Sequence, residues 1–148
     1  MSTSSINLIK LCVGAKNVSD LDHWQSLQLN DQNTDESKKK IIHVTRMWPK
    51  RKQELLSGGS IYWVFRGLIL ARQKILGLEE ITGADTITRC GLVLDQKIFN
   101  TIPKPKRAFQ GWRYLTPEQA PLDVGQYSKN TEELPYKLQV ELSRLGVR

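Results

Sequence analysis

The sequence has few cysteines and few histidines. Its 148 residues include only Cys12, Cys90, His23 and His43 as soft or imidazole ligands. Both cysteines lie in apolar stretches, so we interpret them as buried hydrophobic residues and not as a disulfide or metal ligands. Neither histidine has a second ligand three or four residues away. We therefore predict no metal site and no cofactor.

Long apolar runs are also absent. No stretch approaches the ~18 apolar residues that cross a membrane. The opening MSTSSINLIKLCV lacks the charged and apolar regions of a secretory signal. We expect a cytoplasmic protein without a membrane partner. The length and the composition, 39% hydrophobic and 25% charged, are typical of one soluble globular domain over residues 1–148.

Strong catalytic motifs are missing too. The sequence has no G-x-S-x-G elbow and no Cys–His pair close in sequence. Gly58-Gly59 is not a P-loop, because no Lys-Ser/Thr follows it. One enzymatic alternative stays open: a small hydrolase of modified nucleosides. It would use Thr45 or Lys50 with Glu79 or Glu80, one of which could act as a general base after desolvation.

Positive charge is present and unevenly distributed. The formal net charge is +7 and the sequence pI is about 9.5. Residues 37–53 and 96–117 contain no carboxylate, and acidic residues cluster elsewhere. Segregated charge of this kind produces a field that attracts nucleic acid. The basic residues of the two segments are Lys38, Lys39, Lys40, Arg46, Lys50, Arg51 and Lys52, then Lys97, Lys104, Lys106, Arg107 and Arg113.

Each basic segment also carries a tryptophan, Trp48 or Trp112. Cations bind phosphates, and aromatic faces stack on unpaired bases. We predict that both indoles are partly exposed, whereas Trp24 belongs to an apolar helical stripe in the core. We predict that residues of the two segments line a common cleft. Thr45 would contact a base edge or sugar, Trp48 and Trp112 would stack on bases, and phosphates would bind Arg46, Lys50 and Arg51. The opposite wall would be formed by Lys104, Lys106, Arg107 and Arg113.

Apolar periodicity predicts an α+β fold with a mixed, mostly antiparallel sheet and flanking helices. Helices are expected at 18–29 with Ser19 as N-cap, at 49–56 with Pro49 in the first position, from Thr116 onward, and at 135–145. Residues 30–39 should be a mobile polar loop, and 99–109 an extended basic loop, because Pro103 and Pro105 cannot donate to a ladder. Strands are expected at 6–13, 41–48, 60–67, 68–81, 86–95 and 110–115.

Several phrases resemble a bacterial family, the domain of unknown function numbered 1489. They are LIKLCVG, HVTRMWPKR, GGSIYWVFRG, ARQKILGLEE, RCGLVLD and FQGWRYL, and they span residues 6 to about 122. The family implies no assigned activity and no catalytic residue.

The order strand, basic helix, glycine turn and bent strand is more distantly similar to the PUA-like superfamily, which includes the ASCH and EVE domains. That similarity implies a small pseudo-barrel that binds RNA or modified bases in a cleft, although the ASCH signature G-x-K-x-x-E-x-R is absent. We therefore predict an RNA- or modified-nucleotide-binding protein with a basic, aromatic-lined cleft. A protein partner stays an alternative, and the sequence does not indicate an oligomeric state.

Overall fold

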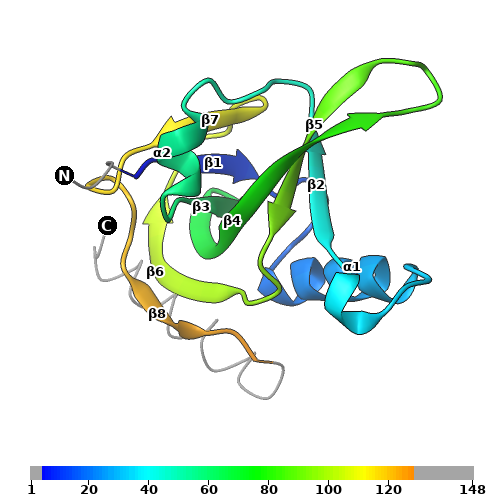
Figure 1. Ribbon diagram of the computed structural model, residues 1–148. Coiled ribbons are helices and arrows are strands. Elements are labelled where there is room, and N and C mark those ends of the chain that lie inside the picture. The colour runs from blue at the N-terminus through cyan, green and yellow to red at the C-terminus, as the bar shows by residue number, and fades with distance from the viewer. Residues whose placement is uncertain (1–4, 129–148) are drawn as a thin grey trace.

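The structure, a computed structural model, describes residues 5–128 (Figure 1). The expected helix at 135–145 lies outside the described residues. In chain order the elements are β1 (Asn7–Leu11), α1 (Val18–Asn30), the 3₁₀ turn η1 (Glu36–Lys38), β2 (Ile41–Thr45), α2 (Lys52–Leu56), β3 (Ser60–Phe65), β4 (Leu68–Thr82), β5 (Thr88–Leu94), β6 (Phe99–Pro105), β7 (Trp112–Leu115) and β8 (Asp123–Gln126).

The eight strands form one sheet with a path of six, β2-β5-β4-β3-β1-β7; β6 joins β4, and β8 joins β6. Of these pairs β1–β3 is parallel and the others are antiparallel. The predicted α+β class with a mixed, mostly antiparallel sheet is confirmed. Within residues 5–128 the end strands β2 and β7 do not pair with each other, so the sheet does not close. The finer expectation of a PUA-like pseudo-barrel stays a prediction.

The fifteen-residue strand β4 connects the two halves of the sheet. Its first half pairs with β3 and β6, and its second half, from Ile75, pairs with β5. Register shifts occur next to Ile69 and between Ile75 and Gly77. Such irregularities increase local twist and bend a strand. The bent strand is visible in green in Figure 1, and it lets the sheet curl around a core.

Two glycines explain the connections on either side of β3. Gly67, with φ +86°, follows Arg66, with φ +49°, and the pair forms the tight turn between β3 and β4. A Cβ on Gly59 would lie 2.1 Å from the Ile6 carbonyl oxygen and 2.5 Å from that of Leu55. Gly59 therefore lets the end of α2 approach the chain at the start of β1.

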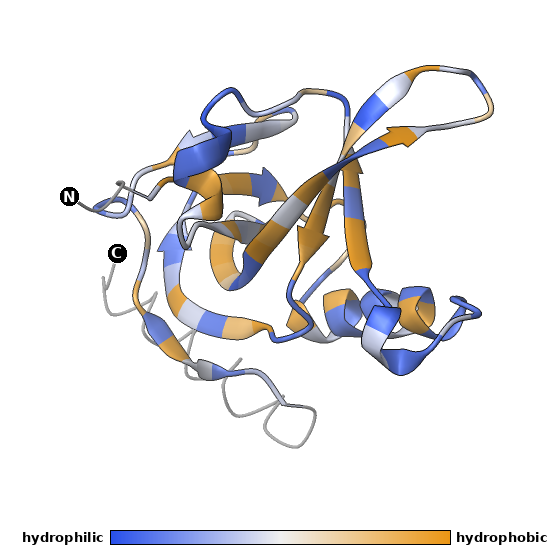
Figure 2. Ribbon diagram, in the orientation of Figure 1, coloured by the Kyte–Doolittle hydropathy of each residue, from blue (hydrophilic) through white to orange (hydrophobic). Residues whose placement is uncertain are grey.

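Buried side chains form two clusters on opposite faces of β1, β3 and β7. The larger includes Leu8, Ile61, Leu92 and Trp112, and the smaller includes Ile9, Val64 and Leu115. In Figure 2 the strands around the larger cluster are mostly orange, whereas α1 alternates between orange and blue. Helix α1 thus covers the core with one face, and none of the helices described is long and apolar enough to cross a membrane.

Two helix starts differ from the prediction. Asn17, and not Ser19, is the N-cap of α1, since its side-chain oxygen accepts a hydrogen bond from the Asp20 amide at 3.0 Å. Helix α2 begins at Lys52, beyond Pro49. The Arg51 amide donates to the Tyr114 hydroxyl at 3.0 Å. This tertiary hydrogen bond fixes the backbone of Arg51 to β7, and the helix therefore begins at the following residue.

The predicted extended loop at 99–109 forms β6 instead, and β8 pairs with it. The prolines of β6 are tolerated because β8 pairs only with Phe99–Thr101, which leaves the rest of β6 as an edge. Thr116 starts no helix: its hydroxyl accepts from the Gln119 amide at 3.3 Å, but the chain turns and enters β8 at Asp123. The predicted loop at 30–39 includes η1, and its mobility stays a prediction.

Candidate nucleic-acid interface

The residues of the first basic segment that we predict to contact phosphates lie on the surface between β2 and α2. Arg46 and Lys50 are exposed, and neither forms an ion pair within residues 5–128. Trp48 is 36% exposed. Arg51, in contrast, is already engaged by two neighbours: it donates to both carboxylate oxygens of Glu54, at 2.6 and 2.8 Å, and its guanidinium lies 5.4 Å from the Tyr114 ring centre.

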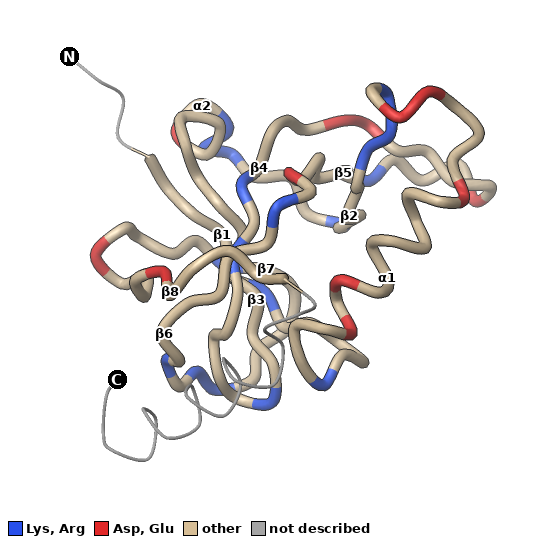
Figure 3. The backbone as a smooth tube through the Cα atoms, turned by 90° about the horizontal axis from the view of Figure 1, so that it is seen from below, with Lys and Arg blue, Asp and Glu red and all other residues tan. Residues whose placement is uncertain are grey.

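The second basic segment surrounds the turn between β3 and β4. Lys104 is opposite Ile69, and the Lys106 amide donates to the Gly67 carbonyl at 2.9 Å. The Lys104 ammonium donates to the Gln119 carbonyl, Arg107 is exposed, and Arg113 covers Phe109 at 4.9 Å. Figure 3 shows basic residues beside β6 well apart from those at α2. None of the predicted phosphate contacts from Arg46 to Arg51 or from Lys104 to Arg113 lines the pockets described below, so a shared groove between them stays a prediction.

The prediction that Trp112 is partly exposed is wrong. Its side chain is 7% exposed and belongs to the larger core cluster. Because β7 pairs with β1, the pleat turns Trp112 and Tyr114 inward and Arg113 outward. The Trp112 indole N–H donates to the Met47 carbonyl at 3.0 Å. Trp112 therefore does not offer its face to a base, but it joins the two basic segments.

The residues of the enzymatic alternative do not converge. Thr45 is 7% exposed, donates to the Met47 carbonyl at 3.2 Å and hydrogen-bonds the Cys90 thiol. Glu79 lies opposite Gly91 and Glu80 opposite Cys90, so the two side chains point to different faces. Glu79 is paired with Lys40 at 2.6 Å. Nothing in this arrangement favours hydrolysis, which stays a prediction.

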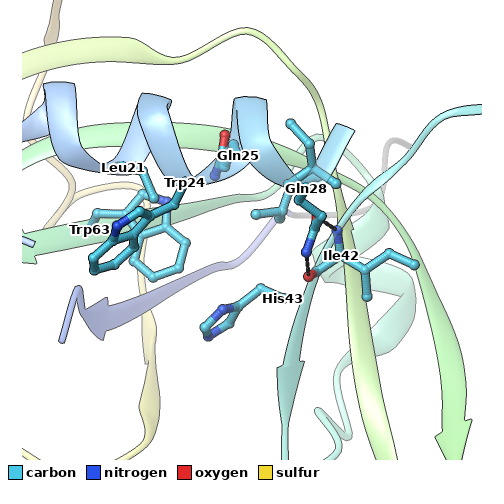
Figure 4. Close-up of a pocket in the computed structure, with 9 residues that line it drawn as sticks. Leu21, Trp24, Gln25, Gln28, Ile42, His43 and Trp63 are labelled. Atoms are coloured by element: carbon cyan, nitrogen blue, oxygen red, sulfur yellow. Dashed lines mark hydrogen bonds between the residues drawn. The ribbon is translucent and has the colours of Figure 1, made fainter. Parts of the chain in front are cut away.

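A pocket that the sequence did not indicate lies between α1 and the start of β2 (Figure 4). Its volume is about 170 Å³. Figure 4 shows side chains of α1 facing those of β2 and β3. Trp24 is 43% exposed, so its assignment to the core was wrong. The lining residues are Leu21, Trp24, Gln25, Gln28, Ile41, Ile42, His43, Trp63 and Leu94.

A buried polar network fixes the inner wall of this α1–β2 pocket. Gln25 and Gln73 exchange two amide hydrogen bonds of 2.7 Å. The Gln73 oxygen also accepts from the Trp63 indole N–H at 3.0 Å, and its amide donates to the Asp95 carbonyl at 2.9 Å. Gln73 thus uses all its polar atoms, as a fully buried amide must. The network holds α1 against β4 and sets the orientation of Trp63.

Two glutamines, Gln28 in the last turn of α1 and Gln32 just beyond its end, bind the chain at the start of β2. The Gln28 side chain accepts from the Ile42 amide at 2.8 Å and donates to the Ile42 carbonyl at 3.1 Å. Gln32 makes the same two contacts with the backbone of Lys40. These side chains take the place of a neighbouring strand along the outer edge of β2. Helix α1 therefore both covers the pocket and protects this edge.

His43 carries the unusual electrostatics of the pocket. Its ring meets Trp63 edge to face at 5.0 Å, and its Nε2 atom is buried without a hydrogen-bond partner. Burial and, as the smaller cause, the charge of Lys10 together lower the His43 pKa to about 4. The imidazole is consequently neutral at neutral pH. One buried nitrogen of the ring therefore has no hydrogen-bond partner among the described residues.

Lys10 links the pocket to the first basic segment. On β1 it lies opposite Trp63 of β3 and Trp112 of β7. Trp112 in turn holds Met47, which is next to Arg46 and Trp48. The half-buried Lys10 is near enough to His43 for its charge to lower the His43 pKa. Through Trp112 and Met47, Lys10 is also connected to the segment that carries Arg46 and Trp48.

The family model described as "Protein of unknown function (DUF1489)" matches residues 8–148. The chain belongs to this family. No curated protein and no solved structure matches it. The family description assigns no activity, so function must be inferred from the geometry. Among residues 5–128 no three His, Cys, Asp or Glu side chains are grouped as metal ligands.

Proposed function

We propose that the protein binds single-stranded RNA, with one base in the α1–β2 pocket and the phosphates on Lys10, Arg46 and Lys50. The observation that carries the proposal is the α1–β2 pocket itself. It combines an exposed indole, Trp24, with a neutral imidazole that has a free nitrogen. Stacking on an aromatic face and hydrogen bonding to an unpaired base are the usual elements of single-strand recognition.

The size of the pocket supports a base more than a whole nucleotide. Pockets for drug-sized ligands measure roughly 300–1,000 Å³, and this one measures about 170 Å³. Only one ring system would enter, and the sugar and phosphates would remain outside. Unpaired cations are available there, because Arg46 and Lys50 have no acidic partner in the described part of the chain.

The same proposal extends to the fold. A PUA-like pseudo-barrel is supported by the way the two ends of the open sheet approach each other. The Trp112–Met47 hydrogen bond joins β7 to the chain that follows β2. Helix α1 covers the outer edge of β2, where Gln28 and the following Gln32 hydrogen-bond to the backbone of Ile42 and Lys40. The α1–β2 pocket lies beside this helix-covered edge.

The test is fluorescence anisotropy with a labelled twelve-nucleotide single-stranded RNA at increasing salt. Three phosphate contacts predict a slope of log affinity against log salt of about −2. Trp24→Ala should lower affinity about tenfold or more, since base stacking contributes roughly 1–3 kcal/mol. Leu27→Ala is the matched control, because Leu27 is 50% exposed on the same helix and does not line the pocket.

Lys10→Gln and Arg46→Gln should each reduce the salt slope by about 0.7. Lys16→Gln, at an exposed lysine away from the pocket, should leave it unchanged. A flat salt response of the unmodified protein, or equal affinities of Trp24→Ala and Leu27→Ala, would contradict the proposal.

A further inference from the structure

A second, larger pocket lies on the outer face of the β2-β5-β4 part of the sheet. Its volume is about 390 Å³, within the usual range of small-molecule pockets. The lining includes Leu76 and Val93, which are 54% and 9% exposed. Val93 pairs with Ile42 and Gly77, and the missing side chain of Gly77 leaves room beside it. We call this the outer pocket; it shares only Leu94 with the α1–β2 pocket.

The two carboxylate-free segments of the sequence meet at the outer pocket. Lys39 and Lys40 come from the first segment, and Lys97 comes from the second. Asp95 is the one acidic residue of the lining, and its carboxylate accepts from the Lys97 backbone amide at 3.0 Å. Three lysines and one aspartate thus surround an apolar surface. The proposed RNA contacts use none of these lysines.

The three ammonium groups differ in availability. Lys39 and Lys40 are paired with Glu36 at 2.8 Å and with Glu79 at 2.6 Å. The Glu36 side chain is 88% exposed, so this pair is weak and a ligand can compete for its lysine. Lys97 is exposed and forms no ion pair within residues 5–128. Lys97 is therefore the principal anion contact.

We propose that the outer pocket binds a small organic monoanion, an apolar ring or short chain that carries one carboxylate. The apolar body would cover Leu76 and Val93, and the carboxylate would bind Lys97 and Lys39. A polyanion fits less well, because Glu36, Glu79 and Asp95 are close and would repel further negative charge. Apart from Leu94 the two pockets have different lining residues, and this proposal does not depend on RNA binding.

The test uses two probes that differ in charge only, 4-phenylbutyrate and its neutral amide, with the full chain in a calorimeter. We expect the amide to bind about tenfold more weakly, because hydrogen bonds to a charged group are the stronger ones. Lys97→Gln should weaken phenylbutyrate binding about fivefold or more. Lys16→Gln removes the same charge elsewhere on the surface and should have no effect.

Leu76→Asp provides a second variant that should fold, since over half of this side chain is exposed. It should abolish phenylbutyrate binding and leave the affinity for the twelve-nucleotide RNA unchanged. The proposal is overturned if the amide binds as tightly as the acid, or if Lys97→Gln and Lys16→Gln behave alike. It is likewise overturned if Leu76→Asp retains full binding.

Discussion

At the scale of single residues, buried polar groups define the α1–β2 pocket. Gln73 has all its hydrogen bonds satisfied and fixes Trp63, whereas His43 has a buried nitrogen without a partner. An unsatisfied buried polar atom costs free energy unless something else binds it. The two sides of the pocket therefore differ. On the Gln73 side all polar atoms are hydrogen-bonded, whereas on the His43 side one buried nitrogen has no partner.

The lowered pKa of His43 predicts a pH dependence of stability. The imidazole titrates at about 4 in the folded chain and at its ordinary value of 6.5 when unfolded. Between these values the unfolded chain binds more protons, so stability is full above about 6.5 and falls as the pH is lowered to 4. The loss should be roughly 2–3 kcal/mol, given ~1.4 kcal/mol for each pH unit.

Urea unfolding of the protein and of His43→Leu at several pH values between 7 and 4.5 checks this. The variant should lose most of the pH dependence in this window. His23→Gln, at an exposed histidine of α1, should keep it. Parallel pH profiles of His43→Leu and the unmodified protein would show that His43 does not titrate in this way.

At the scale of elements, α1 replaces a missing neighbour of β2. Strand β2 is the end of the sheet, and an exposed edge is open to pairing with other chains. Gln28 lies in the last turn of α1, and Gln32 lies just beyond the end of the helix. Lys40 and Ile42 are two residues apart, so their amides and carbonyls point in the same direction along the edge. The side chains of Gln28 and Gln32 therefore reach backbone groups that lie on the same side of the chain.

The double substitution Gln28→Ala and Gln32→Ala should leave the backbone groups of Lys40 and Ile42 open to water and to other chains. We expect a loss of about 1–2 kcal/mol in stability, because these hydrogen bonds are solvent-accessible. Amide exchange at Lys40 and Ile42 should become faster, and self-association should increase. Gln53→Ala, at an exposed glutamine of α2, is the control. Unchanged exchange at both amides would exclude the edge-protecting role.

At the scale of the whole molecule, hydrogen bonds made by Trp112 and Tyr114 of β7 join the two ends of the open sheet. Trp112, on the end strand β7, binds the Met47 carbonyl in the chain after β2. These residues are far apart in sequence, and within residues 5–128 no strand pairing connects β7 to β2. The contact therefore also positions the loop that carries Arg46, Trp48 and Lys50.

Trp112→Phe and Trp24→Phe should separate stability from binding. Trp112→Phe removes one of the two hydrogen bonds that the Met47 carbonyl accepts and leaves a cavity in the core, so we expect a loss of roughly 2–4 kcal/mol in denaturant unfolding. Trp24→Phe changes a half-exposed ring and should cost less than about 0.5 kcal/mol. Equal losses for the two variants would mean that the Trp112–Met47 contact does not hold the ends of the sheet together.

The sequence by itself determined those features that depend on neighbours in the chain. Apolar periodicity predicted strands that correspond to β1, β3, β4 and β5, and the boundary expected between 60–67 and 68–81 matches the turn between β3 and β4. Extended backbone and positive φ are local properties, so local composition is sufficient to predict them. The cationic segments were also visible, because charge is a property of the residue type.

Tertiary structure alone decided which aromatic and polar side chains are exposed. Trp24 and Trp112 were assigned the reverse of their observed positions, since a tryptophan is apolar whether or not another strand covers it. Pairing of β7 with β1 buries Trp112, while α1 leaves Trp24 at the rim of a pocket. Strands β6 and β8 likewise exist only because β4 offers a partner edge to β6. Burial and strand pairing depend on residues that are distant in sequence, so the local sequence pattern does not predict them.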